Sequence, residues 1–343
     1  MSETKRTEIG TLGEFGLIDR LTQDWPLYHH NTLKGVGDDA AVLNDGVEAI
    51  LVTTDMLIEG IHFDLAYHPL KHLGYKSIIV NLSDIYAMNG HAEQVFVSVG
   101  ISNRFSVEAI EELYAGIRVA CETYKVDLAG GDTCSSGKGL VISVTAIGRA
   151  AKDKIVYRKG ATPGDLICVS GDLGAAYLGL QILEREKQLF IAHPKIQPDL
   201  EGQDYLIGRQ LKPEARKDMI EIFAQYQLLP TAMIDISDGL SSDLMHICKQ
   251  SGTGARLDEA QIPIREDAEL MALKFQMDPT TCALSGGEDY ELLFTARPDD
   301  LEKLRVMPGV YLIGEIVAKD QGIMLQTSGG QLHRLTAQGW THF

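Results

Sequence analysis

Acidic residues recur along this 343-residue chain at turns and at the ends of apolar segments, often beside glycine. Alone, an Asp beside glycine or before a helix is usually a turn residue or a helix N-cap. Several of these acids follow apolar strands, and α/β folds gather ligands at the ends of their strands. The pattern therefore favours a fold that brings separate acidic motifs to one site. They are Gly37-Asp38-Asp39, Thr53-Thr54-Asp55, Asn81-Leu82-Ser83-Asp84, Gly130-Gly131-Asp132, Asp235-Ile236-Ser237-Asp238-Gly239 and Gly287-Glu288-Asp289.

Apolar periodicity predicts a mixed α and β chain with two domains. Residues 49–54 predict a buried strand that ends at the acid, and residues 126–129 predict a short strand running into a Gly-Gly-Asp turn. A polar, turn-rich stretch follows the next predicted strand. We predict an N-terminal α+β domain over residues 1–149 and a C-terminal α/β domain over residues 150–343.

Two of the helices predicted in the N-terminal domain have informative sequences. Thr11 and Glu14 resemble a capping box that opens a helix over residues 12–21. Residues 70–88 predict a longer helix that ends at Asn89-Gly90. Polar side chains lie on its apolar stripe, and such groups need polar partners when they are buried. They are Ser77, Asn81 and Asp84.

Composition excludes several classes of protein. The 48 acidic and 31 basic residues give a formal net charge of −17, which disfavours nucleic-acid binding because affinity for phosphates comes from Lys and Arg. No apolar run is long enough to span a membrane, and the first ten residues lack the apolar core of a signal peptide, so we expect a cytoplasmic protein. The five cysteines form no CxxC pair, which argues against a thiolate zinc site or a disulfide framework.

Electrostatics limits what can lie between converging acids. Two carboxylates about 5 Å apart repel by roughly 3 kcal/mol at an effective dielectric constant of 20. Several together therefore need raised pKa values or divalent cations. Oxygen ligands without a Cys/His cluster favour Mg²⁺ or Mn²⁺, and Mg²⁺ commonly joins carboxylates to substrate phosphates. The acids therefore indicate metal-assisted phosphoryl chemistry.

Other phosphate-binding signatures fit poorly. The segment GDTCSSGKG is one residue longer than a P-loop and lacks the Ser or Thr after Lys138. The segment GVGDDA matches a dinucleotide-binding pattern, but its two acids would repel a pyrophosphate. The Gly171-Asp172-Leu173-Gly174 turn could bind an anion at the start of a helix, or be an ordinary strand-to-helix connection.

Seven motifs occur in order over almost the whole chain, and together they closely resemble the thiamine-monophosphate kinase family of the ATP-binding superfamily that includes aminoimidazole ribonucleotide synthetase. They are GVGDDAAVL, TTDMLIEGIHF, VNLSDIYAMNG, LAGGDT, YRKGATPGD, IDISDGLSSDL and LSGGEDYELLF. The resemblance implies transfer of a phosphoryl group from ATP to thiamine phosphate, which gives thiamine diphosphate, the last step of its biosynthesis. It also implies a homodimer in which the N-terminal sheets form a barrel, and an active site in the cleft between the domains.

The resemblance further implies roles for individual residues. Several Mg²⁺ ions would be held by Asp39, Thr53, Thr54, Asp55, Asp84, Asp132, Asp235 and Asp238, although the sequence leaves open whether Asp38 or Asp39 is the ligand. ATP would contact Gly131, Asp132, Arg158 and Ser237. Thiamine phosphate would contact His62, Glu288 and Trp340.

No general base is expected, because the attacking phosphate of thiamine phosphate is largely deprotonated at pH 7. Alternative functions are another ATP-dependent enzyme of the superfamily, such as aminoimidazole ribonucleotide synthetase, or a non-catalytic Mg²⁺- or nucleotide-binding protein. A selenophosphate synthetase or the hydrogenase-maturation dehydratase is disfavoured, because the expected N-terminal or C-terminal cysteine is absent.

Overall fold

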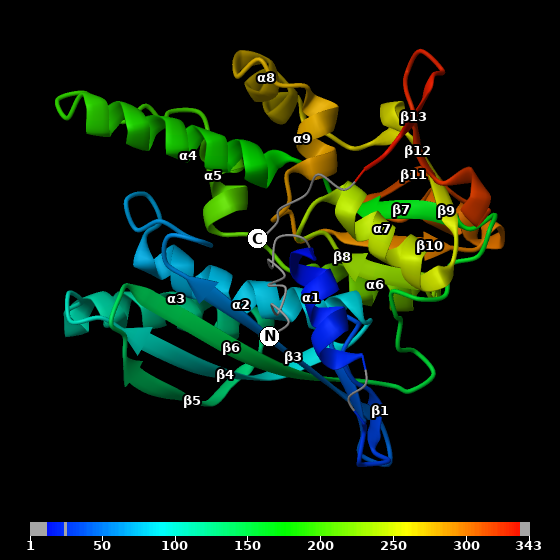
Figure 1. The fold of residues 1–343 in the computed structure, drawn as a ribbon, viewed down its shortest axis with the longest axis horizontal. Helices are drawn as coiled ribbons and strands as arrows, with labels where there is room; N and C mark the ends of the chain where they lie inside the picture. Colours follow the sequence, from blue (N-terminus) through cyan, green and yellow to red (C-terminus); the bar gives the residue numbers. More distant parts are fainter. Residues whose placement is uncertain (1–11, 24–25, 337–343) are drawn as a thin grey trace, which may run out of the picture.

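The computed structural model describes residues 12–23 and 26–336 and arranges them in two units (Figure 1). The N-terminal unit carries one sheet with two long helices on one face, and a short helix, α1, beside the C-terminal unit. Its elements are α1 (Gly13–Thr22), β1 (Thr32–Lys34), β2 (Ala41–Asn44), β3 (Ala49–Ile58), α2 (Leu70–Ala87), β4 (His91–Ile101), α3 (Val107–Tyr124), β5 (Asp127–Ser135) and β6 (Leu140–Ala150).

The N-terminal sheet has the strand order β1-β2-β3-β6-β4-β5, and only the β4/β5 pair is parallel. Burial alternates along β6, so one face of the sheet packs on α2 and α3 while the other stays more open. The two helices approach closely through reciprocal glycines. A Cβ on Gly74 would lie 1.9 Å from the Leu113 carbonyl oxygen, and one on Gly116 would lie 1.8 Å from that of Lys71.

The C-terminal unit carries a second sheet, in the order β13-β12-β9-β11-β7-β10-β8. The β12/β9 pair is parallel and the other pairs are antiparallel, so the unit is α+β rather than the predicted α/β. Its elements are β7 (Leu166–Ser170), α4 (Ala175–Ala192), α5 (Asp204–Leu211), α6 (Lys217–Tyr226), β8 (Ala232–Asp235), α7 (Leu240–Ser251), β9 (Gly254–Asp258), α8 (Glu266–Lys274), α9 (Pro279–Ser285), β10 (Leu292–Ala296), α10 (Leu301–Leu304), β11 (Val310–Val317), β12 (Ile323–Gln326) and β13 (Leu332–Arg334), with 3-10 turns η2 (Glu259–Gln261), η3 (Pro298–Asp300) and η4 (Lys319–Gln321).

One hydrophobic core crosses between the units. It joins α2 of the N-terminal unit, including Leu82 and Ile85, to α6 and β10 of the C-terminal unit. There the rings of Phe223 and Phe294 pack edge to face with centroids 5.0 Å apart. Because α2 also contacts β8, this core fixes the position of α2 against the end of the C-terminal sheet.

Two strands differ from their predicted ends. The predicted strand 49–54 continues to Ile58, so Asp55 lies within β3 opposite Val144 of β6. The predicted strand 126–129 likewise continues to Ser135, because its Gly-Gly-Asp segment pairs with β4 instead of forming a turn. Ladder pairing thus overrides the local preference of Asp and Gly for turns.

The predicted helices agree with the structure. The helix predicted over residues 70–88 is α2, and the helix predicted over residues 12–21 is α1, although the proposed cap, Thr11, lies outside the described residues. Among the described helices none is long and apolar enough to cross a membrane. The boundary at 149/150 stays a prediction.

Candidate metal centre between the two units

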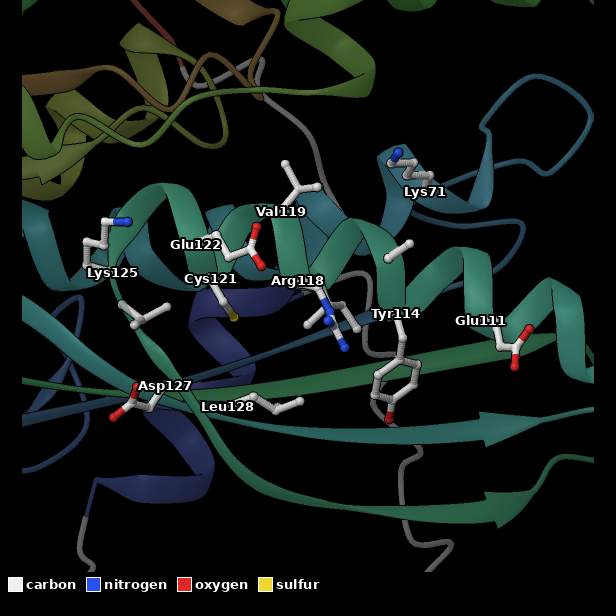
Figure 2. Close-up of a pocket in the computed structure, with 13 residues that line it drawn as sticks. Lys71, Glu111, Tyr114, Arg118, Val119, Cys121, Glu122, Lys125, Asp127 and Leu128 are labelled. Carbon is white, nitrogen blue, oxygen red and sulfur yellow. The ribbon is translucent and has the colours of Figure 1, made fainter.

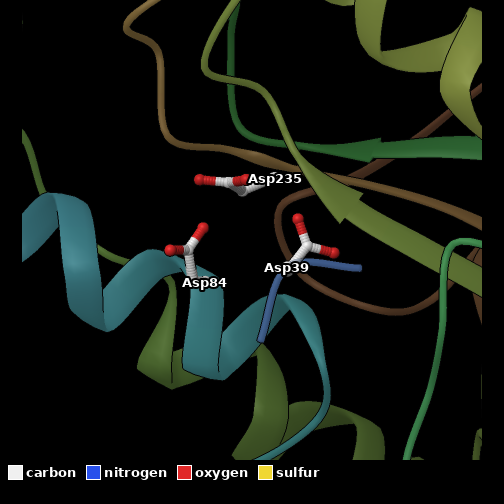
Figure 3. A group of neighbouring side chains, drawn as sticks. All are labelled: Asp39, Asp84 and Asp235. Carbon is white, nitrogen blue, oxygen red and sulfur yellow. The ribbon is translucent and has the colours of Figure 1, made fainter. Parts of the chain in front are cut away.

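Three carboxylates from separate elements converge where the units meet (Figure 3). Asp39 comes from the loop before β2, Asp84 from α2 and Asp235 from the end of β8. Each offers an oxygen that lies within 4.8 Å of the others, and Asp39 and Asp235 are buried. The sequence prediction that acids far apart in the chain gather in one place holds for these three.

Hydrogen bonds fix the orientation of each acid. The Thr53 hydroxyl donates to Asp84 Oδ2 at 2.6 Å, and the Ser83 hydroxyl donates to Asp235 Oδ2 at 2.6 Å. Arg158 donates to Asp39 Oδ1 from Nη2 at 2.7 Å and from Nε at 3.2 Å. Asp39 Oδ2 is buried and has no hydrogen-bond partner in the described part of the chain.

Burial and repulsion from neighbouring acids raise the pKa values of Asp235, Asp84 and Asp55. Burial, followed by the nearby charge of Asp39, raises the pKa of Asp235 to about 7. Burial and the charge of Asp55 raise the pKa of Asp84 well above its ordinary value. For Asp55, burial and then the charge of Glu14 raise the pKa to about 6. The site is therefore short of positive charge. Among the described residues, Arg158 is the only cationic side chain that donates a hydrogen bond to Asp39, Asp84 or Asp235.

This shortage fits a hard divalent cation. All the donor atoms are oxygens, and one of them is the unpartnered Asp39 Oδ2. Burial and then the charges of neighbouring acids raise the pKa values of Asp84 and Asp235. Mg²⁺ accepts this donor chemistry, whereas Zn²⁺ ordinarily takes nitrogen or sulfur ligands.

The polar stripe of α2 also finds its partners here. Asn81 accepts a hydrogen bond from the Asp55 backbone N–H at 3.0 Å and donates to the Ser77 carbonyl oxygen at 3.1 Å. Ser77 in turn donates to the Gly74 carbonyl oxygen at 2.8 Å. The stripe therefore attaches β3 and its acid to the helix that carries Asp84.

Other predicted ligands are not brought into the cluster. Thr54 alternates to the opposite face of β3 from Thr53, where its hydroxyl donates to the Val144 carbonyl oxygen at 3.0 Å. Of the adjacent acids, Asp39 joins the cluster, whereas Asp38 accepts the Arg158 backbone N–H at 3.0 Å.

Gly131 and Asp132 lie on β5, the exposed edge strand. The register Asp55–Val144–Val97–Gly131 places β6 and β4 between this strand and β3. Within one chain, β5 is therefore roughly 14 Å from Asp55, which is three inter-strand spacings.

Residues 236–239 form the loop between β8 and α7. Asp243 of α7, which is buried, accepts the backbone N–H groups of Asp238 at 3.2 Å and Gly239 at 3.1 Å. The same loop is tied to residues 288–290, because the Glu288 N–H donates to the Ser237 carbonyl oxygen at 2.8 Å. Ser237, predicted to contact ATP, and Glu288, predicted to contact thiamine phosphate, thus lie on two loops that are hydrogen-bonded to each other.

Residues predicted to bind thiamine phosphate are placed in part. His62 follows β3, and its Nδ1 accepts the Ile58 N–H at 3.0 Å. Glu288 forms an ion pair with Lys76 of α2, with Nζ and Oε1 2.9 Å apart. Trp340 lies outside the described residues.

Sequence reasoning missed several supporting residues. Ser83 adjoins Asp84, and Asp243 follows Asp238 within the same motif, so their neighbourhood in the sequence was the available signal. Lys76 and Gln210 carry no comparable signal, since only the fold brings them to Glu288.

A separate groove of about 930 Å³ lies between α3 and β5 (Figure 2). Its walls include Tyr114, Arg118, Cys121 and Leu128, and none of the predicted site residues lines it.

Comparison with known proteins covers nearly the whole chain. Residues 37–150 match the N-terminal domain of AIR synthase related proteins, and residues 162–325 match their C-terminal domain. The thiamine-monophosphate kinase of Aquifex aeolicus (strain VF5) is 33% identical, over 97% of this chain and 98% of the relative. The thiamine-monophosphate kinase of Bacillus subtilis (strain 168) is 32% identical, over 97% of this chain and 100% of the relative. A solved structure, AaThiL complexed with AMPPCP and TMP, superposes with a TM-score of 0.82 at 32% identity and covers 100% of both chains.

Proposed function

Because the chain belongs to the thiamine-monophosphate kinase family of AIR synthase related proteins, we propose that it transfers the γ-phosphoryl group of ATP to thiamine phosphate, forming thiamine diphosphate and ADP. The resemblance carried by the sequence motifs is thereby confirmed. The observation that carries the proposal is the convergence of Asp39, Asp84 and Asp235 where the two units meet. We further expect the enzyme to act in the cytoplasm.

The acids would hold several Mg²⁺ ions. Asp39, Asp84 and Asp235 supply the central oxygens. Asp55 lies on β3, which Asn81 ties to the helix of Asp84, and Asp238 lies in the loop that follows Asp235. Bound there, Mg²⁺ supplies positive charge that offsets repulsion between the two phosphate substrates. Thr53 orients Asp84 through its hydroxyl, and the assignments of Thr54 and Asp132 as further ligands remain part of this proposal.

The chemistry needs positioning more than proton transfer. A phosphate oxygen of thiamine phosphate attacks the γ-phosphorus of ATP, the bond to the β–γ bridging oxygen breaks, and ADP leaves with those electrons. The nucleophile carries its charge already at pH 7, so the chain needs no general base. Arg158 would contact the phosphates while holding Asp39, and Ser237 and Gly131 would contact ATP.

Thiamine phosphate would bind beside the loop that carries Glu288. The Glu288 carboxylate suits the cationic thiazolium and the amino group of the pyrimidine. His62 and Trp340 would line the same site. An aromatic ring near a cationic heterocycle gains cation–π and stacking energy.

A homodimer would complete the site. In its described part the sheet is open at β5 on one side, and on the other side at β1 and at the half of β3 beyond Val52, where pairing with β2 stops. Open strand edges favour pairing with another chain. A second copy whose β5 lay beside this half of β3 would close the sheets into a barrel and bring its own Gly131 and Asp132 toward Asp55.

The direct test is product formation. Incubation with Mg-ATP and thiamine phosphate should give thiamine diphosphate and ADP in equal amounts, followed by ³¹P NMR. ADP without thiamine diphosphate would contradict the proposal and favour another acceptor, such as the substrate of an aminoimidazole ribonucleotide synthetase. Mg²⁺-linked thermal stabilisation without any turnover would instead favour the non-catalytic alternative.

A further inference from the structure

A fully buried lysine joins the two units at the edge of the candidate site. Lys76 lies on α2, two helical turns before Asp84, and its side chain is 1% exposed. Its ammonium contacts Glu288 Oε1 at 2.9 Å and donates to the Gln210 carbonyl oxygen at 3.1 Å. Both of these partners come from the C-terminal unit.

Both oxygens of Glu288 are held by separate donors. Oε1 pairs with Lys76, and Oε2 accepts a hydrogen bond from Gln210 Nε2 at 2.6 Å. The Glu288 side chain remains 30% exposed, which leaves room for a ligand to contact it. The amide oxygen of Gln210 is buried and has no hydrogen-bond partner among the described residues, and it adds a second acceptor beside this carboxylate.

The backbone also holds Glu288 in an uncommon conformation. Its φ is +57°, a left-handed value that usually costs a non-glycine residue about 1 kcal/mol or more. The bond from its N–H to Ser237 fixes this conformation against the loop that follows Asp235. Strain held in place by surrounding contacts is typical of residues that must present a side chain in one direction.

We propose that Lys76 and Gln210 are positioning residues that hold the Glu288 carboxylate toward thiamine phosphate, and that this arrangement determines specificity for its nitrogen-rich, cationic part. The inference rests on the proposed function of the site. Stability alone explains the pair poorly, because a buried ion pair often contributes little net stability once the desolvation of both charges is counted.

The test is a double-mutant cycle in the full-length enzyme. Lys76→Met should raise KM for thiamine phosphate about tenfold or more, while kcat and KM for Mg-ATP change by less than about twofold. In a Glu288→Gln background, Lys76→Met should raise KM for thiamine phosphate by less than about twofold, because the carboxylate through which Lys76 acts is already absent. Lys76→Arg should recover most of the affinity. Lys71→Met, an exposed lysine on the same helix, is the matched control and should behave as the wild type.

Gln210→Leu provides a second route if Lys76→Met does not fold, and it should raise the same KM selectively. Equal effects of Lys76→Met with and without the Glu288 carboxylate, or equal increases in KM for both substrates, would overturn the inference and assign Lys76 to general stability. A wild-type enzyme that makes no thiamine diphosphate would defeat the proposed function itself. Normal wild-type turnover with insensitive Lys76 and Gln210 variants would defeat only this inference.

Discussion

Asp235 shows at the scale of one residue how the proposed metal-binding role and the stability of the fold oppose each other. Burial beside Asp39 raises its pKa to about 7, from an ordinary value of 3.8. Between these values the folded protein binds a proton that the unfolded chain has lost, so stability falls as pH rises through this window. Above pH 7 the metal-free fold therefore carries an unfavourable buried charge.

Asp235→Asn should consequently lower kcat by more than about tenfold and yet stabilise the metal-free protein at pH 8 by roughly 1 to 3 kcal/mol. Urea denaturation in EDTA at pH 5 and pH 8 measures the stability change, and the gain should be smaller at pH 5 than at pH 8. Asp320→Asn, at an exposed acid far along the chain, serves as the control. An unchanged slope of stability against pH in Asp235→Asn would show that the raised pKa belongs to another group.

At the scale of elements, the contact between α2 and α3 depends on Gly74 and Gly116. Gly116→Ala should destabilise the fold by about 3 kcal/mol, because the new Cβ would overlap the Lys71 carbonyl oxygen and force the helices apart. Chemical denaturation measures the loss. Gly208→Ala, in α5 with open space around it, should be neutral or slightly stabilising. Equal effects of the two changes would mean that helix propensity, and not this close approach, decides the outcome.

The helices and strands also show which parts of the fold the sequence predicts. The helix α2 follows from its period and its Asn-Gly end, and the polar stripe that stood out in its sequence attaches it to β3. The ends of β3 and β5 did not follow, because Asp and Gly favour turns locally while their ladders with β6 and β4 are set by distant residues. The convergence of Asp39, Asp84 and Asp235 was predictable from motifs, whereas Lys76 meets Glu288 only through the packing of the two units.

At the scale of the whole molecule, if Asp132 is a ligand of the site as proposed, its position decides how many chains build one site. In a single chain β5 lies on the far edge of the sheet from Asp55. If a second copy supplies Asp132, Asp55→Asn and Asp132→Asn should each be inactive alone and should complement each other when mixed. Random reassociation would place one intact site in half of the dimers and restore about one quarter of wild-type activity.

Activity after unfolding and refolding the two variants together measures this complementation. Each variant refolded alone is the control. A mixture as inactive as its components, in which mixed dimers are shown to form, would place the whole metal site within one chain.

The core shared by α2, α6 and β10 has a further consequence for protein engineering. Its two walls come from opposite halves of the chain, so either half produced alone would leave its wall of this core uncovered. A chimera that exchanges one half between relatives must inherit both walls from the same parent, or match their volumes, if it is to remain a single cooperative unit.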